Sequence, residues 1–509
     1  MLEKLGVLRG VFSPKDIHPL LDARELRKTI SELPKDNAFR ALDEIVGWLE
    51  SLQVVHEFSA ERLFEAARQL DEAAQPHLKR LTKEYLHNIR LARADEHRLW
   101  SINHAFWALL AEAYERCIKV VQERGRGADA LKPQIVDLCA KNIVALGGLL
   151  KWDAFHYGPP CSRLWERLGA PLLLAEKLGL AERAGAGLGT AKDEYLRVML
   201  FQIASMDSLL PLEIDLAERI IAHFLKGFHF APEVMEDSVY WVDLALDQAP
   251  QRLFKMPEPL ATSQRFCKPG SGHAAIVALL TELEQGGDVP AALNLGGQYY
   301  ARTVLPVLRH LSLHLAPVPP QREHDRHHVK HRMAVLNGLN NAFAVFPGDS
   351  ATRTTGLPVE SWVVENVSRG GFGAVLNDIP GEWLKVGALL AMQPQGGDNW
   401  VLGVVRRYFR ETQSEARVGI QVLAHRVTAV ELRPRMASSY AAVSGEPGLL
   451  IEGLSLAGEV HLVRAPASFD MHESLEYSHS GLRVRLTPVS VIEQTADYEL
   501  ACYRPGEAA

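Results

Sequence analysis

The fold of the second part of this chain is decided at the segment Asn366-Val367-Ser368-Arg369-Gly370-Gly371. Runs of β-prone residues flank it, with Ser361–Val364 before it and Phe372–Leu376 after it. Asn and Ser side chains commonly cap turn backbones, and glycine adopts positive φ angles without strain. The segment therefore predicts a tight turn between two antiparallel strands.

Short apolar runs of the same kind continue on both sides of this turn. They include Ala342–Phe346, Trp400–Val405 and Ala416–Val422, separated by segments rich in Gly, Pro, Asp and Asn. Several short strands at this spacing are typical of a small antiparallel β-barrel. Further β-prone runs follow at Leu449–Ile451, Glu459–Val463, Leu482–Leu486 and Tyr498–Tyr503. These later runs predict either a second sheet or an extension of the barrel.

The first part of the chain has a different pattern. Apolar residues recur at helical spacing, as in Phe39, Leu42, Val46 and Leu49, and similar stripes continue to about residue 310. One stretch, 240–246, alternates apolar and polar residues as a strand does. We therefore expect a large all-α N-terminal domain with one small hairpin.

A Pro-rich segment, Ala316-Pro317-Val318-Pro319-Pro320, separates the two parts. Proline cannot continue a helix and favours extended chain. The predicted fold class is α+β and multidomain, with a helical domain followed by an antiparallel β-barrel and further C-terminal β structure. The predicted boundaries are 1–315 for the helical domain, 316–332 for a Pro-rich linker and basic arm, 333–435 for the barrel and 436–509 for a β extension or second small β domain.

Composition narrows the classes of function. The 509 residues include 55 Lys and Arg and 62 Asp and Glu, giving a net charge of −7, which argues against a protein that coats nucleic acid. The five cysteines lie far apart with no Cys-x-x-Cys pair, so we expect a reducing cytoplasm and no structural zinc. The sequence has no signal-peptide pattern and no apolar run of about 18 residues, so no membrane span is expected.

Several motifs occur in a fixed order around the turn. A cluster rich in Arg and His at Arg322–Arg332 precedes it, and Val386-Gly387, Gly403–Arg407 and Val418-Gly419-Ile420 follow it. In this order the set resembles the PilZ domain, the small β-barrel receptor for cyclic di-GMP. The resemblance covers roughly residues 322–432. It implies a β-barrel that binds this nucleotide.

The resemblance also implies a set of ligand-binding residues: Arg322, Arg326, Arg332, Asn366, Ser368 and Gly371. Cyclic di-GMP has two phosphates and two flat guanines. Guanidinium groups pair with phosphate oxygens through fixed forks of donors, and they also lie against aromatic faces. An Asn carboxamide and a Ser hydroxyl on a rigid turn complete the polar contacts, and a glycine lets the ligand approach the backbone.

This sequence departs from the family in its basic arm. The pair Arg322-x-x-x-Arg326 has the family's spacing, but the second Arg of the family stands closer to the first strand. By position, the corresponding pair is His328-x-x-x-Arg332, in which His replaces an Arg and lacks the guanidinium fork. Two interpretations follow: the arm is longer here, or one binding Arg has been lost.

The leading hypothesis is a cytoplasmic bacterial receptor for cyclic di-GMP with no catalytic residues. Nucleotide binding would order the arm 321–332 over the turn 366–371, and the helical domain would contact a protein partner. The alternative is a degenerate PilZ-type adaptor that binds protein partners without nucleotide. An enzyme sited among the helices and a metal site at His327 and His331, which would share one helical face, are weaker interpretations.

Overall fold

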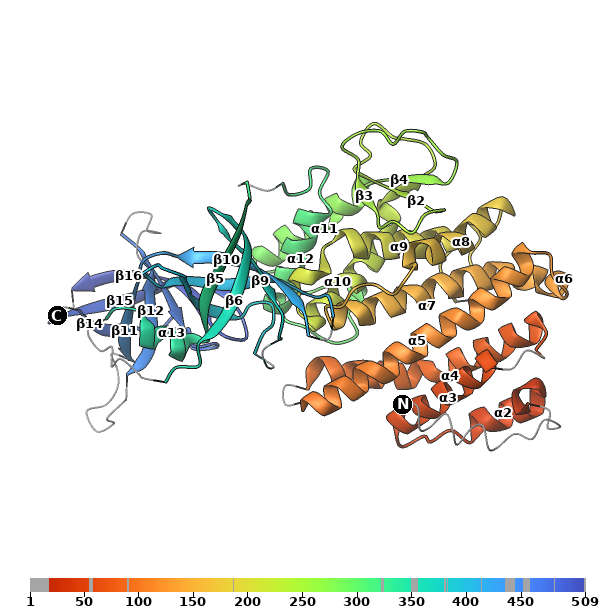
Figure 1. Ribbon diagram of the computed structural model, residues 1–509, viewed down its shortest axis with the longest axis horizontal. Coiled ribbons are helices and arrows are strands. Elements are labelled where there is room, and N and C mark those ends of the chain that lie inside the picture. The colour runs from red at the N-terminus through yellow and green to blue at the C-terminus, as the bar shows by residue number, and fades with distance from the viewer. Residues whose placement is uncertain are drawn as a thin grey trace. The chain divides into compact units, whose positions relative to one another are not determined.

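The structure is a computed structural model, and the residues that it describes are 18–54, 58–88, 91–185, 187–321, 325–348, 356–379, 381, 383–412, 414–434, 445–451, 458–479 and 481–507. The chain divides into two compact units. One comprises Met1–Met206 and Pro211–Pro320, and the other comprises Asp207–Leu210 and Gln321–Ala509. The first unit is mainly helical and the second is built from β-strands (Figure 1).

The first unit contains the helices α2 (Ala23–Ser31), α3 (Ala38–Val54), α4 (Ala60–His87), α5 (Arg93–Gln122), α6 (Ala128–Leu131), α7 (Ile135–Phe155), α8 (Leu164–Lys177), α9 (Ala191–Ile203), α10 (Pro211–Phe224), α11 (Gly270–Glu284) and α12 (Ala301–His314). Helix α5 packs against α3, α4 and α7. The stripe predicted from residue spacing is buried in α3 at Leu42, Val46 and Leu49. The helical prediction is therefore confirmed.

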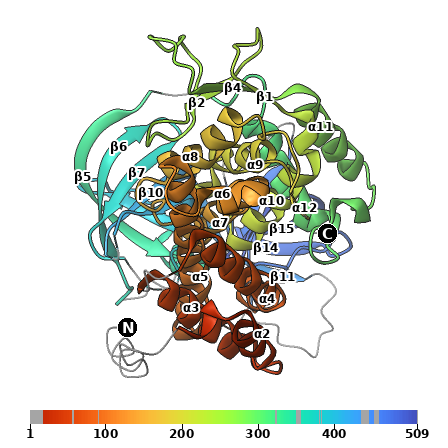
Figure 2. The same cartoon turned by 90° about the vertical axis from the view of Figure 1, so that its right-hand side faces the viewer.

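A four-stranded antiparallel sheet interrupts these helices. Its strands are β1 (His229–Ala231), β2 (Tyr240–Asp243), β3 (Gln251–Arg252) and β4 (Gln264–Lys268), in the order β1-β4-β2-β3. Figure 2 shows β2, β4 and β1 side by side. The sheet is larger than the predicted hairpin, and β2 is shorter than the predicted strand. The strand ends at Asp243 because its carboxylate accepts a hydrogen bond from the Ala245 amide at 3.0 Å, which turns the chain.

The second unit begins with a closed six-stranded antiparallel barrel. Its strands are β5 (His327–Asn337), β6 (Glu360–Ser368), β7 (Gly371–Leu376), β8 (Leu389–Pro394), β9 (Val401–Arg410) and β10 (Ala416–Ala424), in the order β10-β7-β6-β5-β8-β9. The predicted strand at 342–346 is wrong, because this segment belongs to helix α13 (Leu339–Val345). Leu339 and Ala342 stand three residues apart and are both buried, as one face of a helix requires.

The C-terminal residues form a second closed barrel rather than extending the first. Its strands are β11 (Val427–Pro434), β12 (Glu446–Ile451), β13 (Val460–Arg464), β14 (Leu475–His479), β15 (Leu482–Gln494) and β16 (Glu499–Glu507), in the order β11-β12-β13-β16-β15-β14. The two barrels share an apolar core in which Leu389 and Leu402 of the first barrel join Leu449 and Tyr498 of the second. The α+β multidomain fold predicted from the sequence is therefore confirmed.

The basic segment before the first barrel is partly a strand. Residues 327–332, expected to belong to a basic arm, form the first part of β5 and pair with β6, with His327 opposite Val367 and Arg332 opposite Val363. Strand β5 is exposed over these residues and becomes buried from Met333 onward. This change explains why the polar half of the strand carries no apolar signal in the sequence.

Candidate functional site

The predicted turn is present as the hairpin between β6 and β7. Ser368 pairs with Gly371, so that Arg369 and Gly370 form a two-residue loop. The Ser368 hydroxyl donates a hydrogen bond to the Gly371 carbonyl at 3.4 Å. The Val422 amide of β10 donates to the Gly370 carbonyl at 3.0 Å. The loop is thus fixed both by its own Ser side chain and by the neighbouring strand.

Gly371 has a packing role that the sequence did not reveal. A Cβ atom at this position would lie 2.0 Å from the carbonyl oxygen of Ile420 on β10. We expected this glycine to admit a ligand, but here the backbone of a neighbouring strand makes the close approach. Any side chain at position 371 would force β7 and β10 apart.

Two further glycines lower the solvent-facing surface of the barrel beside the hairpin. Across the strands β6, β7, β10 and β9, the residues Asn366, Gly373, Gly419 and Arg407 are successive neighbours. A Cβ on Gly373 would clash with the Asn366 carboxamide, and a Cβ on Gly419 would lie 3.1 Å from Cβ of Arg407. The amide and the guanidinium stem therefore lie over positions that lack side chains.

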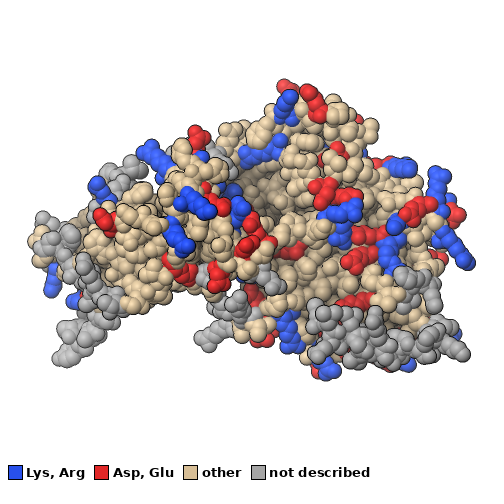
Figure 3. All heavy atoms as spheres, viewed as in Figure 1, with Lys and Arg blue, Asp and Glu red and all other residues tan. Residues whose placement is uncertain are grey.

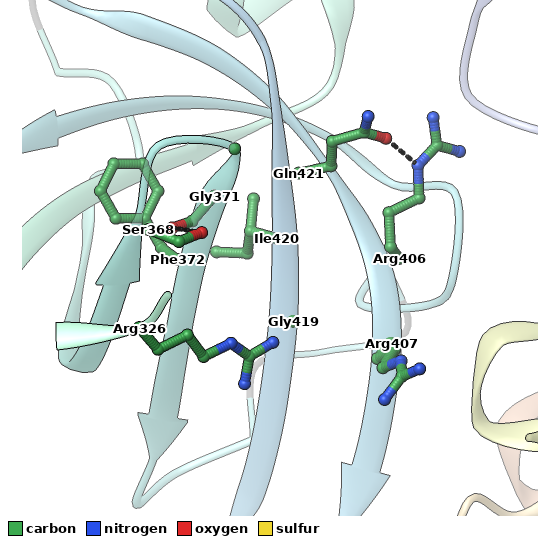
Figure 4. A pocket seen from close by; sticks show the side chains of 10 residues that line it. Arg326, Ser368, Gly371, Phe372, Arg406, Arg407, Gly419, Ile420 and Gln421 are labelled. Carbon is green, nitrogen blue, oxygen red and sulfur yellow. Dashed lines mark hydrogen bonds between the residues drawn. The ribbon is translucent and has the colours of Figure 1, made fainter. Parts of the chain in front are cut away.

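A hollow of about 180 Å³ opens at this place, and its lining is basic (Figure 4). It is lined by the side chains of Arg326, Ser368, Phe372, Arg406, Arg407 and Gln421 and by Gly370, Gly371, Gly419 and Ile420. Among the described residues, no Asp or Glu lines it. Figure 4 shows Arg326 reaching toward Gly419 from one side of β10, while Arg407 extends from β9 on the other side.

A β-bulge brings two successive arginines to this hollow. Gly419 pairs with Arg407 and Ile420 pairs with Val405, so Arg406 is the extra residue in β9. Successive side chains in a regular strand point to opposite faces, so the sequence pattern alone placed only one of the two outside. The Arg406-Arg407 doublet is the signal in the sequence, and we did not assign it to the site.

The two arginines differ in their partners. The Arg406 Nε donates to Oε1 of Gln421 at 2.7 Å, and its Nη2 donates to Oε2 of Glu493 on β15 at 2.7 Å. Burial would lower the pKa of Arg406, but the hydrogen bonds and charge of Glu493 outweigh this effect and hold the pKa above its ordinary value. Arg407 is exposed, and its guanidinium has no ion-pair partner within the described part of the chain.

The other residues predicted for the site are distributed unevenly. Arg322 lies outside the described residues. Arg332 does not line the hollow, and its Nη1 lies 3.4 Å from the Ser361 hydroxyl. Six residues of extended chain, about 20 Å, separate it from Arg326. The structure therefore brings together Arg326, Ser368 and Gly371, leaves Asn366 beside them, and places Arg332 elsewhere.

The helical unit has a larger cavity of about 590 Å³, but its charges are matched internally. Lys151 bonds to Asp215 at 2.6 Å and to Glu218, and Arg219 bonds to Asp215 at 2.8 Å. On the face seen in Figure 3, acidic and basic side chains are likewise intermixed over the helical unit. This cavity therefore offers less uncompensated positive charge to an anion than the hollow on the barrel.

Two other candidates from the sequence do not form sites. His327 and His331 lie on strand β5 and not on one face of a helix, and the described residues bring no three His, Cys, Asp or Glu side chains together as a metal site requires. The loop before α11 packs against Gly227 and Phe228, and His273 bonds to the Ser312 carbonyl at 2.8 Å. None of the helices in the described ranges is long and apolar enough to span a bilayer.

Comparison with known proteins adds one finding for the helical unit and none for the barrels. No curated protein matches the chain. Residues 24–233, from α2 to just beyond β1, match a family described as "Cyclic-di-GMP receptor FimW, N-terminal domain". The match ends before β5, so the resemblance of the first barrel to the PilZ domain rests on its own motifs. Over residues 24–233 the chain is therefore similar to the N-terminal domain of the cyclic-di-GMP receptor FimW.

Proposed function

We propose that this chain is a receptor for cyclic di-GMP and that the nucleotide binds over the basic hollow of the first barrel. The observation that carries the proposal is the convergence of Arg326, Arg407 and the Ser368 hairpin on one hollow whose described lining has no acidic side chain. The similarity of residues 24–233 to a domain of a cyclic-di-GMP receptor supports the same ligand independently. Because the role is that of a receptor, we assign no catalytic residue.

The geometry suggests how the nucleotide is held. The guanidinium groups of Arg326 and Arg407 lie on either side of β10 and can each pair with a phosphate oxygen. Phe372 supplies an aromatic ring and Ser368 a hydroxyl at the edge of the hollow. The hollow is small and open, so the nucleotide would lie across Gly373 and Gly419 on the barrel surface and remain partly exposed.

We further propose that the helical unit carries the output through a protein partner. Residues 321–326 connect Pro320, at the end of the first unit, with the start of β5, and Arg326 belongs to this connection. A nucleotide held by Arg326 would therefore fix the end of the connection against the barrel. This restricts the proposed ordering to residues 321–326, because residues 327–332 already pair with β6.

Titration calorimetry of the full chain with cyclic di-GMP tests the proposed function. We expect saturable binding that weakens as the salt concentration rises, because paired charges at an open site are screened. The control is 5′-GMP, which has one phosphate and one guanine and should bind more weakly. No binding of cyclic di-GMP at any salt concentration would contradict the proposal and favour the adaptor that works without nucleotide.

A further inference from the structure

Arg406 reaches the nucleotide hollow but is held by the second barrel. Its backbone stands at the bulge of β9, and the residue lines the hollow beside Arg407. Its guanidinium donates from both Nη atoms to the carboxylate of Glu493 and from Nε to Gln421. This is a bidentate contact, the geometry in which a guanidinium also binds a phosphate. The side chains of Arg406 and Glu493 are 37% and 23% exposed, so solvent and ions can reach the pair.

Glu493 is fixed in place by its own barrel. A second bulge lies beside it, because Val491 pairs with Ala501 while Glu493 pairs with Leu500. The turn that follows is tied by the hydrogen bond from the Thr495 amide to the Tyr498 carbonyl at 2.9 Å. Glu493 is therefore presented to the first barrel at a defined position.

The barrels stay joined when Arg406 is exchanged. Lys385 of the first barrel bonds to Asp497 of the second at 3.2 Å, which is a separate ion pair across the same boundary. The apolar core shared by Leu402 and Tyr498 also spans the two barrels. Release of the Arg406 guanidinium would thus remove one contact of several and leave the unit intact.

We propose that Arg406 is an additional anion-binding residue of the hollow and that Glu493 competes with a nucleotide phosphate for it. This inference rests on the proposed function. A carboxylate and a phosphate use the same fork of donors, so the guanidinium can hold only one of them at a time. The second barrel therefore lowers the affinity of the first for nucleotide. By reciprocity, bound nucleotide frees Glu493 to take another partner.

The substitution Glu493→Gln tests the competition, because it removes the charge with little change in shape. We expect the full chain with this substitution to bind cyclic di-GMP about five-fold more tightly or better than the unaltered chain in calorimetry. The matched control is Glu431→Gln, which removes a carboxylate paired with Arg433 at 3.7 Å on the second barrel. The control should leave the affinity unchanged, since Glu431 does not line the hollow.

A double-substitution cycle separates competition from a general change of charge. In a chain that carries Arg406→Ala, the further change Glu493→Gln should no longer alter the affinity. Equal affinity of the unaltered and Glu493→Gln chains, or the same gain with Arg406→Ala present, would overturn the inference alone. Absence of binding in both chains would overturn the proposed function and the inference with it. Glu493→Asp, which shortens the carboxylate's reach, provides a second variant if thermal unfolding shows that the Gln chain is misfolded, and it too should bind more tightly.

Discussion

Replacing Arg326 and Arg407 together with alanine is expected to lower the affinity for cyclic di-GMP by about 100-fold or more. A hydrogen bond to a charged group contributes about 1.5–3 kcal/mol, and each factor of ten in affinity corresponds to about 1.4 kcal/mol. Both side chains line the hollow, and together with Arg406 they supply all of its described charge. Calorimetry of the full chain measures the change directly.

The control for this variant must remove the same charge elsewhere. Arg433 and Arg504 are exposed on the second barrel, where they pair with Glu431 and Glu459. The double substitution of these two arginines by alanine should change the affinity by less than about two-fold, because screening weakens charges beyond about 10 Å. Similar losses in both variants would show a general effect of net charge and contradict the assigned hollow.

The substitution Gly371→Ala is expected to destabilise the second unit by about 3 kcal/mol. The added methyl group would lie 2.0 Å from the Ile420 carbonyl oxygen, and that contact is with backbone, which cannot turn away as a side chain can. Strands β7 and β10 would have to separate beside the hairpin. Thermal unfolding followed by circular dichroism at wavelengths sensitive to β structure measures the loss.

Gly506 provides the matched control for this substitution. It lies on β16 of the second barrel, and a Cβ added there meets no atom within 4 Å. Gly506→Ala should therefore change the stability by no more than about 0.5 kcal/mol. If Gly371→Ala left the unfolding transition unchanged and weakened only nucleotide binding, the packing role assigned to this glycine would be wrong.

The sequence predicted those parts of the fold that are written in local patterns. The turn at 366–371 and the strands at 361–364, 400–405 and 416–422 have β-branched residues bounded by turn formers, and all are present. The helical unit is indicated by its apolar stripe at Leu42, Val46 and Leu49. Local periodicity was sufficient because each of these elements buries one face of its own.

The rest depended on contacts between distant segments. Strand β5 begins with exposed, charged residues and gains its order from pairing with β6. Arg406 and Arg407 share one side of β9 only because of a bulge against β10, which no local pattern of the strand specifies. The bond between Arg406 and Glu493 joins residues 87 positions apart. The hollow therefore includes residues that the motif alone did not select.

Hydrogen–deuterium exchange of the full chain, with and without saturating cyclic di-GMP, tests the central claim most directly. The account predicts slower exchange in the backbone amides of β6, β7, β9 and β10 around the hollow, within Glu360–Leu376, Val401–Arg410 and Ala416–Ala424. It predicts no comparable protection around the Lys151 cavity of the helical unit. Protection confined to residues 24–233, with the barrel strands unchanged, would contradict the account and place the nucleotide among the helices.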